Sequence, residues 1–262
     1  MRRTTMGAAT GSPITIVTGA SRGIGRAIAT ALAHEGHRVV LVARDANALA
    51  GVAASLPADQ VHTIAIDLRD EAAAATVVAA TERRFGPPTI VVNNAGTAPS
   101  DKIENTTPAM LRETFDLHVG APLAFARACV PHLKRAGSGC LFHLASTAGL
   151  RGYPFTSAYT AAKHGMVGLA RALHAELRPA GIAVYALCPG FVDSDITRSA
   201  AAAIAARGKT TAEQAFARMA SQNVIGRMHS TDEVARTVAM LLRDRPAGCV
   251  YELDRPQPGF VD

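Results

Sequence analysis

Short apolar runs alternate along the chain with longer segments whose apolar residues recur at helical spacing. Each run is nearly continuous in apolar residues, which is typical of strands buried on both faces of a parallel sheet. The predicted strands are Ile14–Val17, Arg38–Val42, His62–Ile66, Thr89–Val92, Cys140–Leu144 and Ile182–Leu187. The predicted helices between them are Gly25–Glu35, Ala46–Leu56, Glu71–Arg84, Pro108–Arg135 and Ser157–Leu177. This alternation predicts an α/β fold with a doubly wound parallel sheet and helices on both faces.

The pattern changes after the sixth predicted strand. Asp195–Ser221 contains an Ala-rich run and a second helical piece, separated by a break at Arg207–Lys209. An insertion after the carboxyl end of a strand lies where open sheets bind ligands, so this segment is a predicted substrate lid. Thr231–Arg243 follows hydroxyl residues that can cap a helix, and Val250–Leu253 is a candidate last edge strand.

The composition narrows the class of protein. The chain has 262 residues, of which 48% are hydrophobic and 18% are charged, so it can build a sizeable core. We assign one domain to residues 13–262 and treat residues 1–12 as a flexible lead-in, because no linker or repeat interrupts the pattern. No stretch reaches the roughly 18 consecutive apolar residues of a membrane helix, and the start lacks the apolar core of a secretory signal.

Charge and cysteine content bear on the ligand and on the cellular compartment. The net charge of +6 comes almost wholly from arginine, and basic runs with interleaved aromatic residues are absent, which argues against nucleic-acid binding. The positive excess either suits a phosphate-bearing cofactor or only reflects an Arg-rich composition. The four cysteines are scattered without metal-ligand spacing, so we expect reduced, packed thiols, no metal site and a cytoplasmic location.

A glycine-rich segment, Thr18–Gly25, follows the first predicted strand and opens a helix. Glycines at positions 19, 23 and 25 allow a tight turn, so that a pyrophosphate can approach the amino end of the helix. The segment also matches the Gly-x-Ser-x-Gly elbow of hydrolases, but that elbow normally follows several strands and this one follows the first. We therefore favour dinucleotide binding.

Three residues near the fifth strand can perform carbonyl chemistry. Tyr159 and Lys163 are four residues apart, hence on one face of a predicted helix, and Ser146 follows the fifth strand. A tyrosine can give or take a proton, and a nearby ammonium favours the phenolate and lowers its pKa. A serine hydroxyl can hydrogen-bond a carbonyl oxygen as charge develops on it.

Taken together, these features resemble those of the short-chain dehydrogenase/reductase family over nearly the whole chain. The match rests on Thr18–Gly25, Asp67-Leu68, Asn93–Gly96, Ser146, the Tyr159/Lys163 pair and Pro189–Val192, in that order. The resemblance implies a Rossmann-like sheet of about seven strands, a nicotinamide cofactor and hydride transfer to or from a carbonyl or hydroxyl carbon.

The resemblance also implies which residues contact the cofactor. Those expected near the phosphates and ribose are Gly19, Ser21, Arg22, Ile24 and Gly25. Those expected at the adenine and the middle of the cofactor are Asp67, Leu68, Asn94, Ala95 and Gly96. Those expected at the nicotinamide end are Tyr159, Lys163, Gly190, Val192 and Ser194, the last standing where the family usually has threonine.

The end of the second strand bears on the choice between NADP and NAD. Members of the family that prefer NAD usually place a carboxylate there, to bind the ribose 2′-hydroxyl. In this chain the position is Ala43, and Arg44 follows it, so a guanidinium can bind a 2′-phosphate, with help from Arg22. We predict NADP(H), while the neighbouring Asp45 keeps NAD possible.

Three positions depart from the family pattern. His118 stands where the family commonly has asparagine, Ala145 replaces a serine, and Cys249–Pro258 replaces a C-terminal Asp-Gly-Gly pattern. In the family the asparagine shapes a helix break whose carbonyl holds a water that links the lysine to solvent. We therefore include His118 among the candidate catalytic residues, either as a member of this relay with a pKa near neutrality or as scaffold.

The predicted function is NADP(H)-dependent reduction of a ketone or 3-oxoacyl group. The alternatives are an NAD-dependent alcohol dehydrogenase and a cofactor-binding protein without turnover. Tyr153, Phe191 and the lid are expected to form an apolar substrate pocket, and basic lid residues offer a handle for an anionic group: Arg198, Arg207, Lys209 and Arg218. The resemblance implies a homodimer or homotetramer, and we expect no membrane or nucleic-acid partner.

Overall fold

The structure is a computed structural model that describes residues 11–208 and 210–261, with only the backbone described at Arg207. Most of the predicted lead-in therefore lies outside the described residues. Eight strands form one sheet in the order β3-β2-β1-β4-β5-β6-β7-β8. Their bounds are β1 Ile14–Thr18, β2 Arg38–Ala43, β3 Val61–Ala65, β4 Ile90–Asn93, β5 Gly139–Leu144, β6 Ile182–Cys188, β7 Val250–Glu252 and β8 Gly259–Phe260.

Seven strands run parallel, and the chain order reverses between β1 and β4, which confirms the doubly wound α/β fold. The prediction of about seven strands was one short, because the chain turns after β7 and adds β8 in antiparallel register. Consequently Val250–Leu253 is not the last edge of the sheet. Phe260 of β8 lies over Gly248, in a space that a side chain at position 248 would fill.

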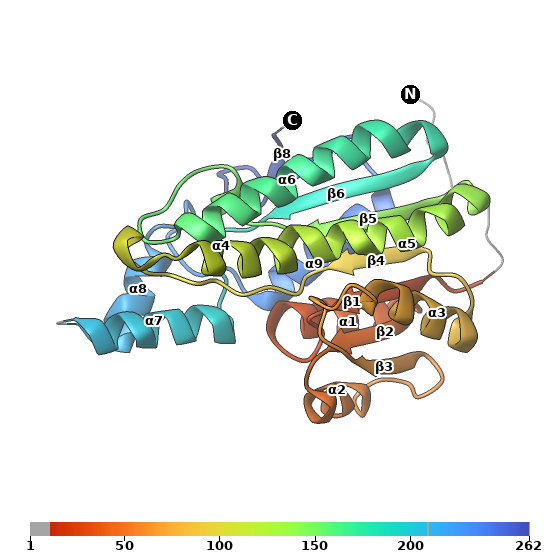
Figure 1. The fold of residues 1–262 in the computed structure, drawn as a ribbon, viewed down its shortest axis with the longest axis horizontal. Coiled ribbons are helices and arrows are strands. Elements are labelled where there is room, and N and C mark those ends of the chain that lie inside the picture. Colours follow the sequence, from red (N-terminus) through yellow and green to blue (C-terminus); the bar gives the residue numbers. More distant parts are fainter. Residues whose placement is uncertain (1–10, 209, 262) are drawn as a thin grey trace.

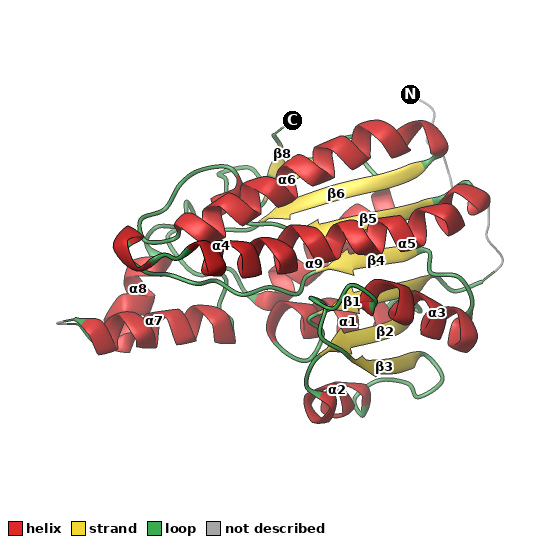
Figure 2. Cartoon of the chain, viewed as in Figure 1, coloured by secondary structure: helices red, strands yellow, loops and turns green. Residues whose placement is uncertain are grey.

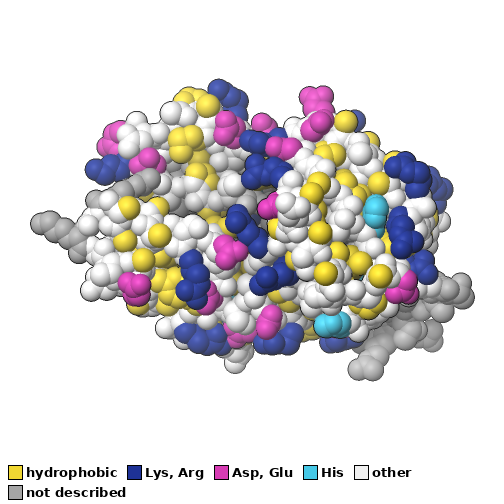
Figure 3. Space-filling model, turned by 90° about the horizontal axis from the view of Figure 1, so that it is seen from below, with side chains coloured by type: hydrophobic (Ala, Val, Ile, Leu, Met, Phe, Trp, Pro, Cys, Tyr) yellow, Lys and Arg dark blue, Asp and Glu magenta, His cyan; other side chains and the backbone are white. Residues whose placement is uncertain are grey.

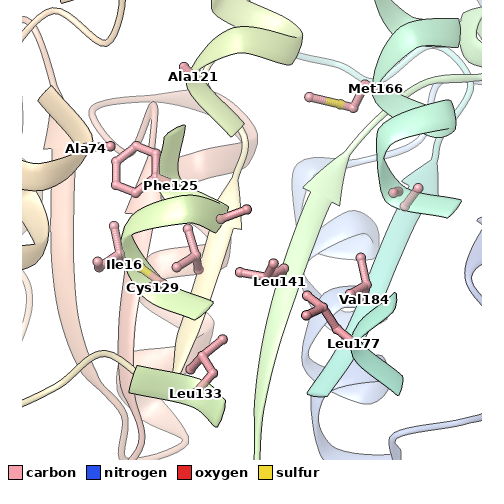
Figure 4. Close-up of a cluster of buried hydrophobic side chains, with 14 of the residues drawn as sticks. Ile16, Ala74, Ala121, Phe125, Cys129, Leu133, Leu141, Met166, Leu177 and Val184 are labelled. Atoms are coloured by element: carbon pink, nitrogen blue, oxygen red, sulfur yellow. The ribbon is translucent and has the colours of Figure 1, made fainter. Parts of the chain in front are cut away.

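Helices cover both faces of the sheet (Figure 1). Their bounds are α1 Gly23–His34, α2 Ala46–Ala53, α3 Ala73–Phe85, α4 Pro108–Phe115, α5 Ala121–Ala136, α6 Ser157–Leu177, α7 Asp195–Arg207, α8 Ala212–Ala220 and α9 Thr231–Asp244. One buried cluster joins the sheet to α3, α5 and α6, and a second joins it to α1, α2 and α9. Figure 4 shows the first cluster, in which Phe125 and Cys129 of α5 and Met166 of α6 face the strands.

The predicted helix Pro108–Arg135 is interrupted. α4 and α5 are joined by a π-helical turn, Asp116–Gly120, in which hydrogen bonds span five residues instead of four. Pro122, at the start of α5, has no N–H to donate to the carbonyl of His118 four residues earlier, so the regular ladder lacks a hydrogen bond here. The break places His118 on the inner side of the helix, 1% exposed.

The strands end together on the side of the molecule from which α7 and α8 project (Figure 2). α7 and α8 pack on each other through a small separate cluster of Ala201, Ala215 and Met219, with Phe191 and Phe216 at its margin. All four cysteines are buried, and none of them forms a disulfide among the described residues, as predicted. Among the described residues, no helix is long and apolar enough to cross a membrane.

Candidate active site

The glycine loop between β1 and α1 has the geometry of a phosphate-binding turn. Gly19 and Gly23 adopt positive φ values of 66° and 53°, which side chains rarely adopt. A Cβ at Gly19 would lie 2.8 Å from the Asn94 amide nitrogen, and a Cβ at Gly25 would collide with the Gly19 carbonyl. The loop can therefore bend this tightly only with glycine at these positions.

Thr18 connects this loop to the loop after β4. Its hydroxyl accepts hydrogen bonds from the backbone N–H groups of Asn94 (2.9 Å) and Ala95 (3.0 Å). The Asn94 side chain donates back to the carbonyls of Thr18 (2.8 Å) and Gly19 (3.2 Å). The two loops thus form one rigid floor. The sequence motif includes Thr18, but this role was missed because the partners are 76 residues away.

The amino end of α1 fits an anionic group. Its N-cap residue, Arg22, is extended and provides no side-chain cap, whereas Asp45, Thr107 and Ser194 cap α2, α4 and α7. The first-turn N–H groups of α1 therefore point outward with the positive end of the helix dipole. Basic side chains gather in the hollow between the α7–α8 part and the α2 part (Figure 3). These features fit the diphosphate of a dinucleotide.

The carboxyl ends of β2 and β3 carry the groups expected at the adenosine end. Arg44 is exposed directly after β2 and forms no ion pair among the described residues. Asp45 accepts the Ala48 N–H at 3.0 Å as the cap of α2. Arg69, which the sequence reading did not single out, binds both carboxylate oxygens of Asp67 and lowers the pKa of Asp67 to about 2. Asp67 is therefore paired with Arg69, whereas Asp45 has one carboxylate oxygen engaged as a helix cap.

Leu68 and the residues expected at the nicotinamide end differ in burial and in hydrogen bonding. Leu68 is only 9% exposed and packs in the core, so its side chain is largely committed to the fold. Val192 is buried and bridges to His229, which fixes the loop after β6. Ser194 caps α7 by accepting the Thr197 N–H at 3.4 Å, and its hydroxyl also lies 3.3 Å from that of Thr197. At Gly190 an added Cβ would meet the buried carboxylate of Asp254.

Ser146, Tyr159 and Lys163 come together at the carboxyl end of β5. Ser146 caps a short 3-10 helix by accepting the Ala148 N–H at 3.1 Å. Burial raises the pKa of Tyr159 to about 12, and a hydrogen bond from the Ser146 hydroxyl opposes this shift. The predicted lowering of the phenol pKa is thus not present in this structure, because desolvation outweighs the other influences. At neutral pH Tyr159 holds its proton.

Lys163 is buried on the next turn of α6. Its ammonium donates to the Leu144 carbonyl at 2.7 Å and lies 5.6 Å from the centre of the Tyr159 ring. Burial lowers the pKa of Lys163 to about 7. The lysine is therefore poised between its charged and neutral forms near neutrality.

His118 belongs to the π-helical turn, and its side chain contacts the loop after β4. Its Nε2 is 2.8 Å from the Thr97 carbonyl, and its ring meets Tyr159 edge-on at 5.7 Å between centres. An added Cβ at Gly96 would collide with the imidazole, so this glycine is required for the close approach. Burial, with a contribution from the Lys163 charge, lowers the pKa of His118 to about 3. A titration near neutrality is not expected for this side chain.

The substrate side is built from the loops after β5 and β6. Tyr153 and Phe191 meet edge-on at 5.9 Å, and the Tyr153 hydroxyl is 2.8 Å from that of Thr147. In the predicted lid, Arg198 forms two 2.7 Å bonds with Asp193 and covers the Phe216 ring. Arg198 is therefore a structural clamp of α7 and α8, not a free handle. The Arg207 side chain and Lys209 lie outside the described residues.

Comparisons with known proteins agree with this architecture. A family model described as short chain dehydrogenase matches residues 13–205. Two Streptomyces proteins are named as "putative ketoacyl reductase" of the monensin and granaticin polyketide synthases, from Streptomyces virginiae and Streptomyces violaceoruber. They are 32% and 35% identical, over 90% of this chain and 92% and 88% of their own lengths. A crystal structure of an actinorhodin polyketide ketoreductase variant with NADPH has a TM-score of 0.86 at 28% identity, covering 92% of this chain and 95% of that one.

The chain belongs to the short-chain dehydrogenase family. The Rossmann-like fold and the family membership predicted from the sequence are thus confirmed.

Proposed function

We propose that this protein is an NADPH-dependent reductase of ketones or 3-oxoacyl groups. The observation that carries the proposal is the meeting of Ser146, Tyr159 and Lys163 beside a glycine loop shaped for a dinucleotide. Two relatives named as ketoacyl reductases match about nine tenths of the chain, which favours a 3-oxoacyl substrate.

The chain's own residues provide the acid and the oxyanion support. When bound, the nicotinamide supplies the hydride. A substrate oxygen between Ser146 and Tyr159 receives a hydrogen bond from the serine and a proton from the tyrosine. Since the pKa of Tyr159 is raised to about 12, the phenol carries that proton at neutral pH. The Lys163 ammonium stabilises the phenolate that remains.

The surroundings of Arg44 support NADPH over NADH. β2 ends at Ala43, and the nearby carboxylates of Asp45 and Asp67 are engaged with α2 and Arg69. A ribose 2′-hydroxyl would find only the partly engaged Asp45 carboxylate there, whereas a 2′-phosphate would find the exposed guanidinium of Arg44. Because Asp45 already caps α2, it gives little support to the NAD-dependent alternative.

We include in the proposal a single domain over residues 13–262, with Asp195–Ser221 as its substrate lid, a cytoplasmic location and a homodimer or homotetramer. The apolar side chains of Leu111, Phe115 and Leu123 are each more than two fifths exposed on α4 and α5, which supports a subunit contact there. Light scattering at micromolar concentration tests it, and a monomer would contradict it.

The test of the activity is turnover of a ketone panel by the purified protein with NADPH and with NADH. We expect faster oxidation of NADPH, with 3-oxo esters among the substrates. Comparing kcat/KM for a free 3-oxo ester and its thioester tests for a carrier-linked substrate, since a basic handle would favour the thioester of an anionic carrier. Binding of NADPH without turnover on any carbonyl would support the non-catalytic alternative.

A further inference from the structure

Two polar side chains lie inside the sheet close to Lys163 without hydrogen-bond partners. Asn93 of β4 and His143 of β5 are register partners in neighbouring parallel strands, so their side chains emerge on the same face. Asn93 is 2% exposed and His143 is 0% exposed. Both amide atoms of Asn93 and both ring nitrogens of His143 have no partner within the part of the chain that the structure describes.

Asn93 and His143 lie on the face of the sheet that α6 covers, the helix that carries Tyr159 and Lys163. Val91 and Leu141, two residues before Asn93 and His143 on the same strands, belong to the cluster beneath α5 and α6. Met166 of α6 lies in that cluster (Figure 4), and its sulfur is 3.9 Å from the Lys163 ammonium. The charge of Lys163 acts on His143, as it does on His118, whose Nδ1 also lacks a partner among the described residues.

Such a cluster is costly unless something satisfies it. A buried polar group without a partner destabilises the folded state, and five such atoms occur in these three side chains. Buried water is the usual solution, since one molecule typically makes about three hydrogen bonds to groups of this kind. The Lys163 ammonium has three N–H donors, and the Leu144 carbonyl accepts only one of them, at 2.7 Å. The ammonium can therefore donate to a buried water as well.

We propose that Asn93 and His143 hold buried water beneath Lys163, and that this polar pocket sets the pH at which Lys163 loses its proton. Both are positioning residues, because they act on the reaction only through the lysine. The inference rests on the proposed role of Lys163 in the site. The pocket solvates the ammonium from the core side, on the strands, and is separate from the cofactor side of the lysine.

The other titratable groups around Lys163 do not change their protonation state near neutral pH. They are His143 from β5, His118 from the π-helical turn, Cys188 from β6 and Tyr159 on its own helix. Burial and the lysine charge lower the pKa of His143 to about 4 and that of His118 to about 3. Burial raises the pKa values of Cys188 and Tyr159 to about 12. Between about pH 6 and 10, therefore, Lys163 alone in this group changes its charge.

The test is direct titration of Lys163 by NMR. The chain has four lysines, Lys102, Lys134, Lys163 and Lys209, so labelling lysine with ¹³C at Cε gives a small set of signals, and Lys163→Arg assigns the one of interest. In His143→Phe, an apolar ring replaces the imidazole, and we expect the Lys163 pKa to fall by about one unit, a tenfold loss of proton affinity. His143→Asn keeps a polar side chain and should hold the pKa within about 0.3 units of wild type.

An unchanged Lys163 pKa in His143→Phe would overturn the inference. If that variant does not fold, Asn93→Leu removes the other half of the pocket and carries the same expectation. The titration needs no turnover, so its outcome is independent of the proposed activity. Where the wild type reduces a ketone, the alkaline limb of kcat should move to lower pH in His143→Phe and return in His143→Asn.

Discussion

The two halves of the carboxyl edge of the sheet are built on different principles. Around α1, the proposed binding groups are mainly backbone, with two positive φ values and an uncapped helix end, and exposed arginine side chains lie beside them. Around α6, the proposed function uses buried side chains with displaced pKa values, and Tyr159, Lys163 and His118 lie there. The first half is sensitive to added atoms, and the second is sensitive to changes in polarity. Each can therefore be damaged while the other is left intact.

The largest effect is expected from removing the acid in the second half. Tyr159→Phe deletes only the hydroxyl, so we expect kcat/KM for ketone reduction to fall by about 10²–10⁴-fold. NADPH affinity, measured by fluorescence titration, should stay within about twofold, because the loop that binds the diphosphate is untouched. Tyr251→Phe, at a partly exposed tyrosine of β7, is the control and should keep full activity. Full activity in Tyr159→Phe would remove the phenol from the mechanism.

One methyl group added to the glycine loop should weaken cofactor binding in the first half. In Gly19→Ala the new Cβ would lie 2.9 Å from Ala95 Cα, at a φ of 66°, so the loop must shift. We expect NADPH affinity to drop at least about tenfold and stability to fall by about 1–3 kcal/mol. Gly51→Ala adds the same methyl where nothing lies within 4 Å, in α2, and should be neutral or slightly stabilising. Equal affinities in the two variants would contradict the rigid floor.

Cofactor preference tests the role of Arg44 in the first half. Arg44→Ala removes an exposed guanidinium, and we expect the ratio of kcat/KM with NADPH to that with NADH to fall about tenfold, the value of one charge-assisted contact. Arg178→Ala, an exposed arginine after α6, should leave the ratio unchanged. A ratio that Arg44→Ala does not alter would show that another group reads the 2′-phosphate.

Acid stability should also depend on His118 in the second half. Because the pKa of His118 is lowered to about 3 in the folded state, the unfolded chain binds more protons between about pH 3 and 6.5. The free energy of unfolding therefore falls as the pH decreases through this range. His118→Asn should flatten this dependence by up to about 1.4 kcal/mol per pH unit, measured by urea denaturation at several pH values. The kcat profile near neutrality should be unchanged, and an inflection there that this variant removes would place His118 in the proton relay.

The features that follow from local sequence were predicted well. The six strands, the parallel sheet and the capped helix after Ser230 follow from apolar runs and hydroxyl caps, whose effects are confined to neighbouring residues. The glycine loop was predictable for the same reason, since Gly19, Gly23 and Gly25 act through their own backbone. The spacing of Tyr159 and Lys163, with Ser146 placed after the fifth strand, was likewise enough to predict that these side chains lie together.

The protonation states and the contacts of those side chains, by contrast, depend on the folded structure. The sequence pattern indicated that Lys163 lowers the Tyr159 pKa, but burial by residues from several elements raises it. The sequence suggested that Arg198 could bind an anionic group of the substrate, but in the folded chain it contacts Asp193 and Phe216. Likewise, Asn93 and His143 are 50 positions apart and meet only because β4 and β5 pair in register. Desolvation and charge depend on distances through space, and these are set by packing rather than by spacing along the chain.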